Sequence, residues 1–183
     1  QKKRSRDARK NAGADAWVSD ATDLSDVCAT DFVGYTDYEC DATILAIVKD
    51  GERTDSAVEG ESIVVVLDKT PFYAESGGQV ADTGAITMDG TSISVDNVSK
   101  DNNGIFLHVC EVEAGSVKVG DKVKAAIDSD RREDIRRNHT AAHLLQAALR
   151  EVLGSHVQQA GQLVSEDLCR FDFTHFSALT AQE

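Results

Sequence analysis

Residues 62–67 are Ser62-Ile63-Val64-Val65-Val66-Leu67, a run of aliphatic side chains with no polar residue after the first. Branching at Cβ favours extended backbone. An apolar run without polar alternation predicts a strand that is buried on both faces. Such a strand needs neighbours on either side, so we expect a sheet to fold around it.

Short segments with strand character surround this run. They are residues 41–48, 85–88, 91–95, 105–112 and 122–127. Turns separate them, at Lys49-Asp50-Gly51-Glu52, at Asp89-Gly90 and at Val119-Gly120-Asp121. The Asp-Gly pair supplies the positive φ of a tight turn and so predicts a hairpin over 85–95. Many short strands at this spacing predict a closed or nearly closed β-barrel over residues 28–128.

The pattern changes to helix after residue 128. Asp130 and Glu133 resemble a capping box, and Gly154 is a natural C-terminal cap, so we expect a helix that ends near residue 153. The apolar stripe Leu145, Ala148, Leu149 and Val152 is expected to be its buried face. Two strands, 159–164 and 168–173, are predicted to follow. We expect residues 129–183 to be part of a second domain, and residues 1–27 to be the end of a preceding helical region and a linker.

The composition limits the classes of protein. A chain of 183 residues with a net charge of −13 is too acidic to coat nucleic acid with its whole surface. Basic residues gather at 2–10 and at 131–137, where they either dock a phosphate backbone or form ordinary solvated helix faces. No apolar run approaches the roughly 20 residues that span a bilayer. The four cysteines form no Cys-x-x-Cys pair, so we expect reduced thiols in the cytoplasm. The chain lacks an initiator Met, and we expect it to be cut from a longer protein.

A histidine pair is the clearest candidate for chemistry. His139 and His143 lie four residues apart in the predicted helix, so both imidazoles can converge on one metal ion. Histidines that only pack or titrate are the alternative. A helical metalloprotease needs a Glu after the first His, and Thr140 occupies that place, which disfavours protease chemistry. Further ligands could come from His156, or from Cys169 and His175 if one strand presents both on the same face.

A second candidate follows the buried strand, at Thr70-Pro71-Phe72-Tyr73-Ala74-Glu75-Ser76-Gly77-Gly78-Gln79. Adjacent glycines allow a backbone path that is closed to other residues and leave amides free to meet an anion or a carbonyl group. Gln79 can donate and accept hydrogen bonds. A tight turn of the barrel is the alternative explanation of the glycines.

In this order, these segments resemble the alanyl-tRNA synthetase family. The resemblance covers nearly the whole chain and is carried by residues 67–84, 137–145, 153–161 and 170–176. It implies an α+β chain: a mainly antiparallel, translation-factor-like β-barrel, then a long helix and the first strands of an incomplete α/β editing domain. Residues 1–27 would then end an upstream helical tRNA-recognition domain.

The resemblance also implies a chemistry, the hydrolysis of serine or glycine wrongly esterified to tRNA(Ala). In the family, a histidine pair that corresponds to His139 and His143 holds zinc together with a later Cys-x-x-x-His pair, which has no counterpart in this chain. Cys169 stands where the family has an aliphatic residue and is not expected to be a ligand. Gln159 is implied in editing specificity, and Gly77, Gly78 and Gln79 in the same catalytic site.

The resemblance fixes the expected partners and cofactors as well. They are tRNA(Ala) and other domains of the same synthetase, with no membrane and no DNA. Zinc is the expected metal, and ATP would bind only in an aminoacylation domain outside the chain. With half of its zinc ligands missing, the isolated chain is expected to be inactive.

Two other functions stay open at this stage. The first is a free-standing deacylase that edits mischarged tRNA in trans. The second is a non-catalytic barrel that only binds tRNA. The threonyl-tRNA synthetase editing domain shares the paired histidines, but the Pro-Phe-Tyr-Ala-Glu-Ser-Gly-Gly-Gln block favours the alanine family.

Overall fold

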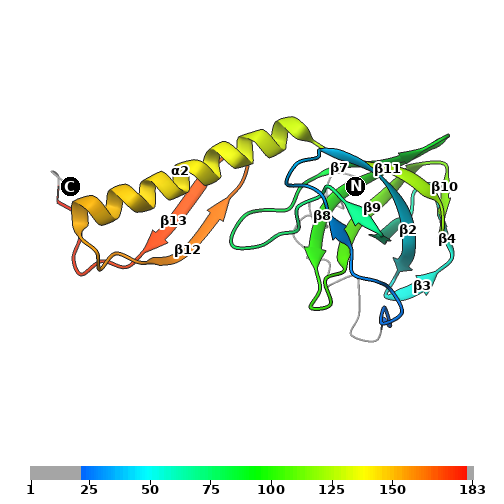
Figure 1. Cartoon of the computed structure of the whole chain (residues 1–183), viewed down its shortest axis with the longest axis horizontal. Coiled ribbons are helices and arrows are strands. Elements are labelled where there is room, and N and C mark those ends of the chain that lie inside the picture. Colours follow the sequence, from blue (N-terminus) through cyan, green and yellow to red (C-terminus); the bar gives the residue numbers. More distant parts are fainter. Residues whose placement is uncertain (1–21, 181–183) are drawn as a thin grey trace. The chain divides into compact units, whose positions relative to one another are not determined.

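The computed structural model describes residues 22–180, which form two compact units. Unit 1 consists of residues 22–75 and 81–128 (Figure 1). Unit 2 consists of residues 76–80 together with the chain from residue 129 onward. The short segment 76–80 thus leaves the first unit and takes part in the packing of the second.

Unit 1 is a closed antiparallel barrel. Its sheet has the strand order β11-β7-β8-β9-β5-β2-β3, and β11 also pairs with β2, which closes a ring of six strands. The strands are β2 (Glu39–Lys49), β3 (Glu52–Thr54), β5 (Ser62–Leu67), β7 (Gly84–Met88), β8 (Thr91–Lys100), β9 (Phe106–Ala114) and β11 (Lys122–Ile127). The predicted barrel is therefore confirmed. The predicted hairpin between β7 and β8 is present as well, with Gly90 at a φ of 71°.

Unit 1 also contains two short strand pairs outside the barrel sheet. β1 (Asp31–Phe32) pairs in parallel with β6 (Lys69–Thr70), and β4 (Ser56–Val58) pairs antiparallel with β10 (Ser116–Lys118). The sequence did not indicate them, because two or three residues are too short for a periodic pattern to stand out.

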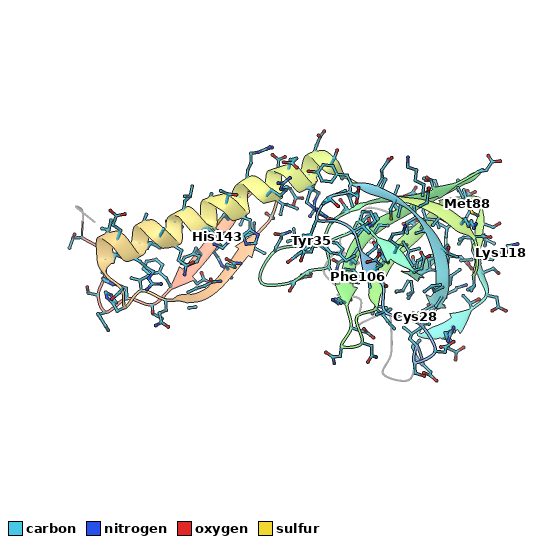
Figure 2. All side chains as sticks on the ribbon, viewed as in Figure 1. Cys28, Tyr35, Met88, Phe106, Lys118 and His143 are labelled. Carbon is cyan, nitrogen blue, oxygen red and sulfur yellow. The ribbon has the colours of Figure 1, made fainter. Side chains whose placement is uncertain are left out.

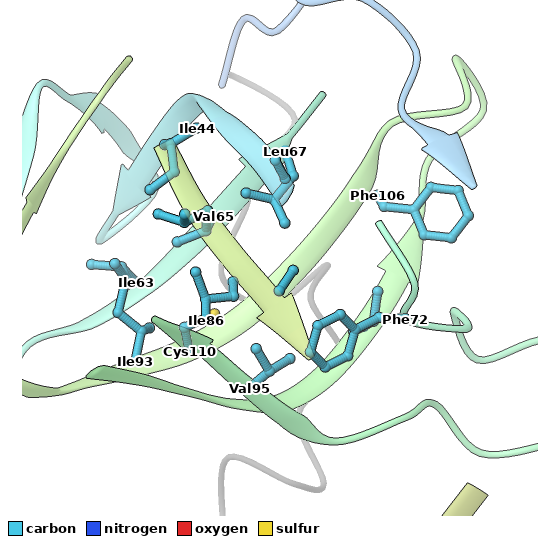
Figure 3. Close-up of a cluster of buried hydrophobic side chains, with 14 of the residues drawn as sticks. Ile44, Ile63, Val65, Leu67, Phe72, Ile86, Ile93, Val95, Phe106 and Cys110 are labelled. Carbon is cyan, nitrogen blue, oxygen red and sulfur yellow. The ribbon is translucent and has the colours of Figure 1, made fainter. Parts of the chain in front are cut away.

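The barrel core explains the apolar run of β5. Ile63, Val65 and Leu67 belong to the main core cluster, and Figure 3 shows them among the side chains directed into the space between the strands. Val64 and Val66 face the other way and pack in a second cluster that includes Leu24. Burial on both faces is thus confirmed. Leu24 is buried in that cluster. Residues 1–21 lie outside the described part, so the helical end and linker expected over 1–27 stay a prediction.

A buried histidine ties the segment after β5 to the barrel. His108 is fully buried, with its Nδ1 2.9 Å from the carbonyl oxygen of Val65 and its Nε2 2.8 Å from the hydroxyl of Thr70. The Thr70 hydroxyl in turn accepts a hydrogen bond from the backbone amide of Phe72. Burial lowers the pKa of His108 to about 4, so the ring is neutral at pH 7. These bonds fix the start of the segment that carries the glycine pair.

Unit 2 contains one helix and one hairpin. The helix α2 (Ser129–Leu153) is followed by Gly154 at a φ of 114°, as its predicted cap requires. The strands β12 (Gln159–Val164) and β13 (Cys169–Phe173) pair antiparallel. Ile135 and Ala142 of the helix pack with Val164 of the hairpin, with Val80 and Cys169 at the edge. A helix followed by two strands agrees with the predicted secondary structure.

The buried face of α2 is not the one that we expected. Leu145, Ala148 and Val152 are exposed, and only Leu149 of the predicted stripe is half-buried. The narrow hairpin covers the face that contains Ile135 and Ala142, and in residues 22–180 no further element covers the stripe. No helix in this part of the chain is long and apolar enough to cross a membrane.

The four cysteines have different degrees of burial. No disulfide joins the four within the described structure, but only Cys110 is buried, and Cys28 is exposed. Burial raises the pKa of the Cys110 thiol far above its ordinary value, which keeps it an inert, protonated core residue.

Candidate functional site

The two candidate metal-ligating histidines lie together on α2. The rings of His139 and His143 are stacked, with centroids 5.0 Å apart and planes inclined by 6°. His139 is half-buried, whereas His143 is exposed, and Figure 2 shows His143 on the side of α2 where the hairpin lies. The i, i+4 spacing thus places two imidazoles side by side, as predicted.

Gln79 joins this pair from a distant part of the sequence. Its side chain is buried, and its Oε1 lies 2.6 Å from Nδ1 of His139. An amide oxygen only accepts hydrogen bonds, so Nδ1 of His139 must be the donor. In a neutral ring, Nε2 then keeps its lone pair and is the nitrogen available to a metal ion or a proton.

The glycine pair forms the turn that presents Gln79. Ser76 and Gln79 exchange two backbone hydrogen bonds, of 3.2 and 3.0 Å. Between them, Gly77 and Gly78 have φ values of 59° and 82°. Positive φ at both central residues is the signature of a type I′ turn, the tightest hairpin connection. A tight turn is therefore present, as in the alternative explanation, but it belongs to unit 2 and not to the barrel.

The turn is attached to the edge of β12. The amide of Val164 donates to the carbonyl of Gly78 over 2.8 Å, and the amide of Val80 donates to the carbonyl of Val164 over 3.0 Å. The side chain of Gln162 donates to the carbonyl of Gly77. Gly78 lies so close to Gln162 that an added Cβ would be 2.4 Å from the Gln162 carbonyl oxygen. Gln79 thus forms an isolated parallel bridge with Val164, at the edge of the two-stranded sheet.

Polar side chains fix α2 relative to the hairpin. The amide nitrogen of Asn138 donates to the carbonyl groups of Ser165 (2.8 Å) and Glu166 (3.0 Å). The guanidinium of Arg131 forms an ion pair with Glu166 over 3.0 Å. No local sequence pattern indicates these contacts, because they join residues that are far apart in the chain. Together they hold the histidine-bearing turn of the helix against β12.

The electrostatics of the site favour a neutral His139. Burial, and then the proximity of His143, lower the pKa of His139. The nearby arginines are committed to carboxylates, Arg136 to Glu133 over 2.7 Å and Arg137 to Asp134. Two arginines of this basic group, Arg136 and Arg137, thus form ion pairs within the helix. The other basic group, at residues 2–10, lies outside the described residues.

The remaining candidate residues do not converge on the histidine pair. Gln159 is exposed at the first position of β12, and within residues 22–180 no hydrogen bond joins it to either histidine. Cys169 packs at the edge of the apolar cluster. His175 lies beyond the end of β13, so no strand presents it together with Cys169.

His156 and His175 contact each other. Nε2 of His156 lies 2.9 Å from Nδ1 of His175, and Phe176 stacks on the His156 ring with centroids 4.4 Å apart. This pair closes the open end of the hairpin, beside the backbone hydrogen bond from Thr174 to Gln158. The contact between His156 and His175 thus joins the residues that flank the two strands.

The donor set fits one half of a zinc site. Two neutral imidazole nitrogens are ordinary zinc ligands, and a hydrogen bond at Nδ1 of one of them matches the usual support for a ligand that binds through Nε2. Across the described residues, no cluster of three or more His, Cys, Asp or Glu side chains could hold a metal ion. Two donors are fewer than the four of a typical zinc site.

Comparison with known proteins identifies relatives. Residues 1–131 match the family described as tRNA synthetases class II (A). The chain is 52% identical over 169 residues to an alanine–tRNA ligase of Acetivibrio thermocellus, an alignment that covers 92% of this chain and 19% of that protein. It is 47% identical to the alanine–tRNA ligase of Exiguobacterium sibiricum over 100% of this chain and 21% of that protein. For the alanine–tRNA ligase of Rhizobium meliloti the identity is 50%, over 85% of this chain and 18% of that protein. The chain thus spans about a fifth of the length of these curated relatives.

Proposed function

The chain belongs to the class II (A) family of tRNA synthetases, and from this we propose that it is a segment of an alanine–tRNA ligase that carries part of an ester-hydrolysing editing site. The observation that supports the site is the contact of Gln79 with His139, next to His143 on the same helix face. Unit 2 would then be the first part of the editing domain, and unit 1 the barrel that precedes it.

The complete enzyme would attach alanine to tRNA(Ala) with ATP, at sites outside this chain. Its partners would be tRNA(Ala) and the other domains of the same polypeptide, in the cytoplasm. The part of the enzyme described here would serve the second reaction, the hydrolysis of serine or glycine esterified to tRNA(Ala).

His139 and His143 are the residues of this chain that would hold the zinc ion, and the remaining ligands would come from outside residues 1–183. A zinc ion bound there would supply Lewis acidity for the attack of water on the ester. The hydrogen bond from Nδ1 of His139 to Gln79 would leave Nε2 as the nitrogen that binds the metal. With two donors alone the chain would bind zinc weakly, so we expect the isolated chain to be inactive.

Recognition of the wrong amino acid would fall to polar groups near the histidines. Gln159 and the backbone of Gly77 and Gly78 are the candidates, because a hydrogen bond to the hydroxyl of serine distinguishes serine from alanine. A site built to bond that hydroxyl leaves its own polar groups unpaired when alanine occupies it, which protects the correct product.

The test is a double substitution, His139→Ala with His143→Ala, in the complete synthetase. We expect hydrolysis of Ser-tRNA(Ala) to fall at least about a hundredfold, on the scale of a lost catalytic metal, with attachment of alanine unchanged. Thr140→Ala is the matched control, because Thr140 lies between the histidines but is exposed and bonds only the backbone of Arg136. Undiminished hydrolysis in the double variant would instead favour a module that only binds tRNA.

A further inference from the structure

We propose that Gln79 is a positioning residue that sets the tautomer of His139, and that it does not act on the substrate itself. This inference rests on the proposed function, in which His139 is a zinc ligand. It deepens that function by naming the group that decides which ring nitrogen of His139 faces the metal.

With the amide oxygen of Gln79 toward His139, the contact permits one tautomer of the neutral ring, whereas an amide turned over to present its NH2 would permit the other. Oε1 of Gln79 accepts a hydrogen bond from Nδ1 of His139 over 2.6 Å, so the proton is on Nδ1 and the lone pair is on Nε2. The opposite tautomer would set the lone pair of Nδ1 against the amide oxygen. Gln79 is only 8% exposed, so its oxygen has little access to water to replace the lost donor. A buried acceptor without a partner is costly, and the pair therefore selects one tautomer.

The backbone holds Gln79 in place before any ligand arrives. Its position is set by the two hydrogen bonds with Ser76 and by the pairing of Gly78 and Val80 with Val164. Gly78 is packed directly on Gln162, which leaves the turn no room to shift toward β12. A rigid turn is what a positioning residue requires, because an orientation that fluctuates would not select a tautomer.

His143 provides the contrast. Its ring stacks on His139, but in the described part of the chain no hydrogen bond holds it, and it is exposed. The two histidines are thus unequal: His139 is oriented by the protein, whereas His143 is free to adopt the orientation that the metal demands. His143 is consequently an internal reference for any measurement on His139.

The direct test is nitrogen NMR of the metal-free chain with labelled histidine, at a pH where the rings are neutral. We expect His139 to carry its proton on Nδ1. In Gln79→Met, which keeps the length and removes the acceptor, we expect a shift toward the Nε2–H form that prevails for histidine in water. Gln79→Glu restores an acceptor and should keep the proton on Nδ1. Gln158→Met, an exposed glutamine with no side-chain bond to either metal-site histidine, should change nothing.

The second readout is zinc affinity of the complete synthetase. Loss of a group that orients a metal ligand typically costs about 10- to 100-fold in affinity, and we expect this for Gln79→Met but not for Gln79→Glu. Unchanged signals of His143 and of the β12 amides would show that the variant is folded. An Nε2–H tautomer of His139 in the unmodified chain, or the same tautomer and zinc affinity in Gln79→Met, would overturn the positioning role. Absence of zinc from the unmodified synthetase would instead overturn the proposed function.

Discussion

The two glycines before Gln79 have different reasons to be glycine. Both have positive φ, but an added Cβ at Gly77 meets nothing within 4 Å, whereas at Gly78 it meets the backbone of Gln162. The sequence alone presents the two as equivalent. The structure shows that Gly77 is required only by its backbone conformation, whereas Gly78 is required by its conformation and by the lack of space for a Cβ.

We therefore predict unequal costs for the two alanine substitutions. Gly77→Ala should destabilise unit 2 by about 1–2 kcal/mol, the cost of a left-handed residue other than glycine. Gly78→Ala should cost more and also displace the turn from β12. Hydrogen exchange of the Val164 amide, which donates to Gly78, checks this. Equal protection of that amide in the two variants would contradict the packing that we describe.

His108 makes the stability of the barrel depend on pH. Its pKa in the folded protein is about 4, below the ordinary value of about 6.5, so the unfolded chain binds more protons between these values. The contribution of His108 to the free energy of unfolding should be fully present above about pH 6.5. It should be lost as the pH drops toward 4, by up to about 3 kcal/mol. Urea unfolding at pH 5 and pH 7 measures it. In His108→Gln the difference between the two pH values should shrink, and an unchanged difference would count against this assignment.

The helix α2 shows at the scale of an element what periodicity can and cannot establish. Its C-terminal end follows from Gly154, a local signal, whereas it begins at Ser129, one residue before the predicted cap Asp130. Which face is buried depends on where the hairpin packs. The contacts of Ile135 and Ala142 with Val164 cannot be predicted from the sequence of the helix alone. The stripe from Leu145 to Val152 has the right spacing for burial but lacks a covering element among residues 22–180.

Substitutions on the two faces of α2 should consequently differ. Ile135 is fully buried, so Ile135→Ala should lower the stability of unit 2 by about 2–5 kcal/mol through loss of contacts and the cavity left behind. Leu145 is 43% exposed, and Leu145→Ala in this chain should cost less than about 1 kcal/mol. Urea unfolding followed by a probe in unit 2 compares them. A larger loss for Leu145→Ala would mean that the stripe is covered in solution.

At the scale of the whole molecule, most of the fold was predictable and the assembly of the site was only partly so. Strands such as β5 and the β7–β8 hairpin have local causes in branched side chains and an Asp-Gly turn. The histidine pair was found because its spacing is helical. The bond from Gln79 to His139 spans 60 residues, and its path through the segment 76–80 depends on pairing with β12 that no local pattern encodes. The family resemblance indicated that Gln79 lies at this site but not what it contacts.

The discontinuous composition of unit 2 has a consequence for function. A helix and hairpin cut at residue 129 would lack the segment 76–80, and with it both the bridge from Gln79 to Val164 and the acceptor for His139. A variant of unit 2 that is to keep its histidine contact must therefore include residues 76–80.

The most direct test of the account is the zinc content of the complete synthetase and of this chain, each measured by native mass spectrometry. We expect one tightly held zinc at the editing site of the synthetase, lost in the variant with His139→Ala and His143→Ala, and weak binding by residues 1–183 alone. A zinc ion retained by the double variant at that site, or held equally tightly by the short chain, would contradict the assignment of these two histidines as half of a divided metal centre.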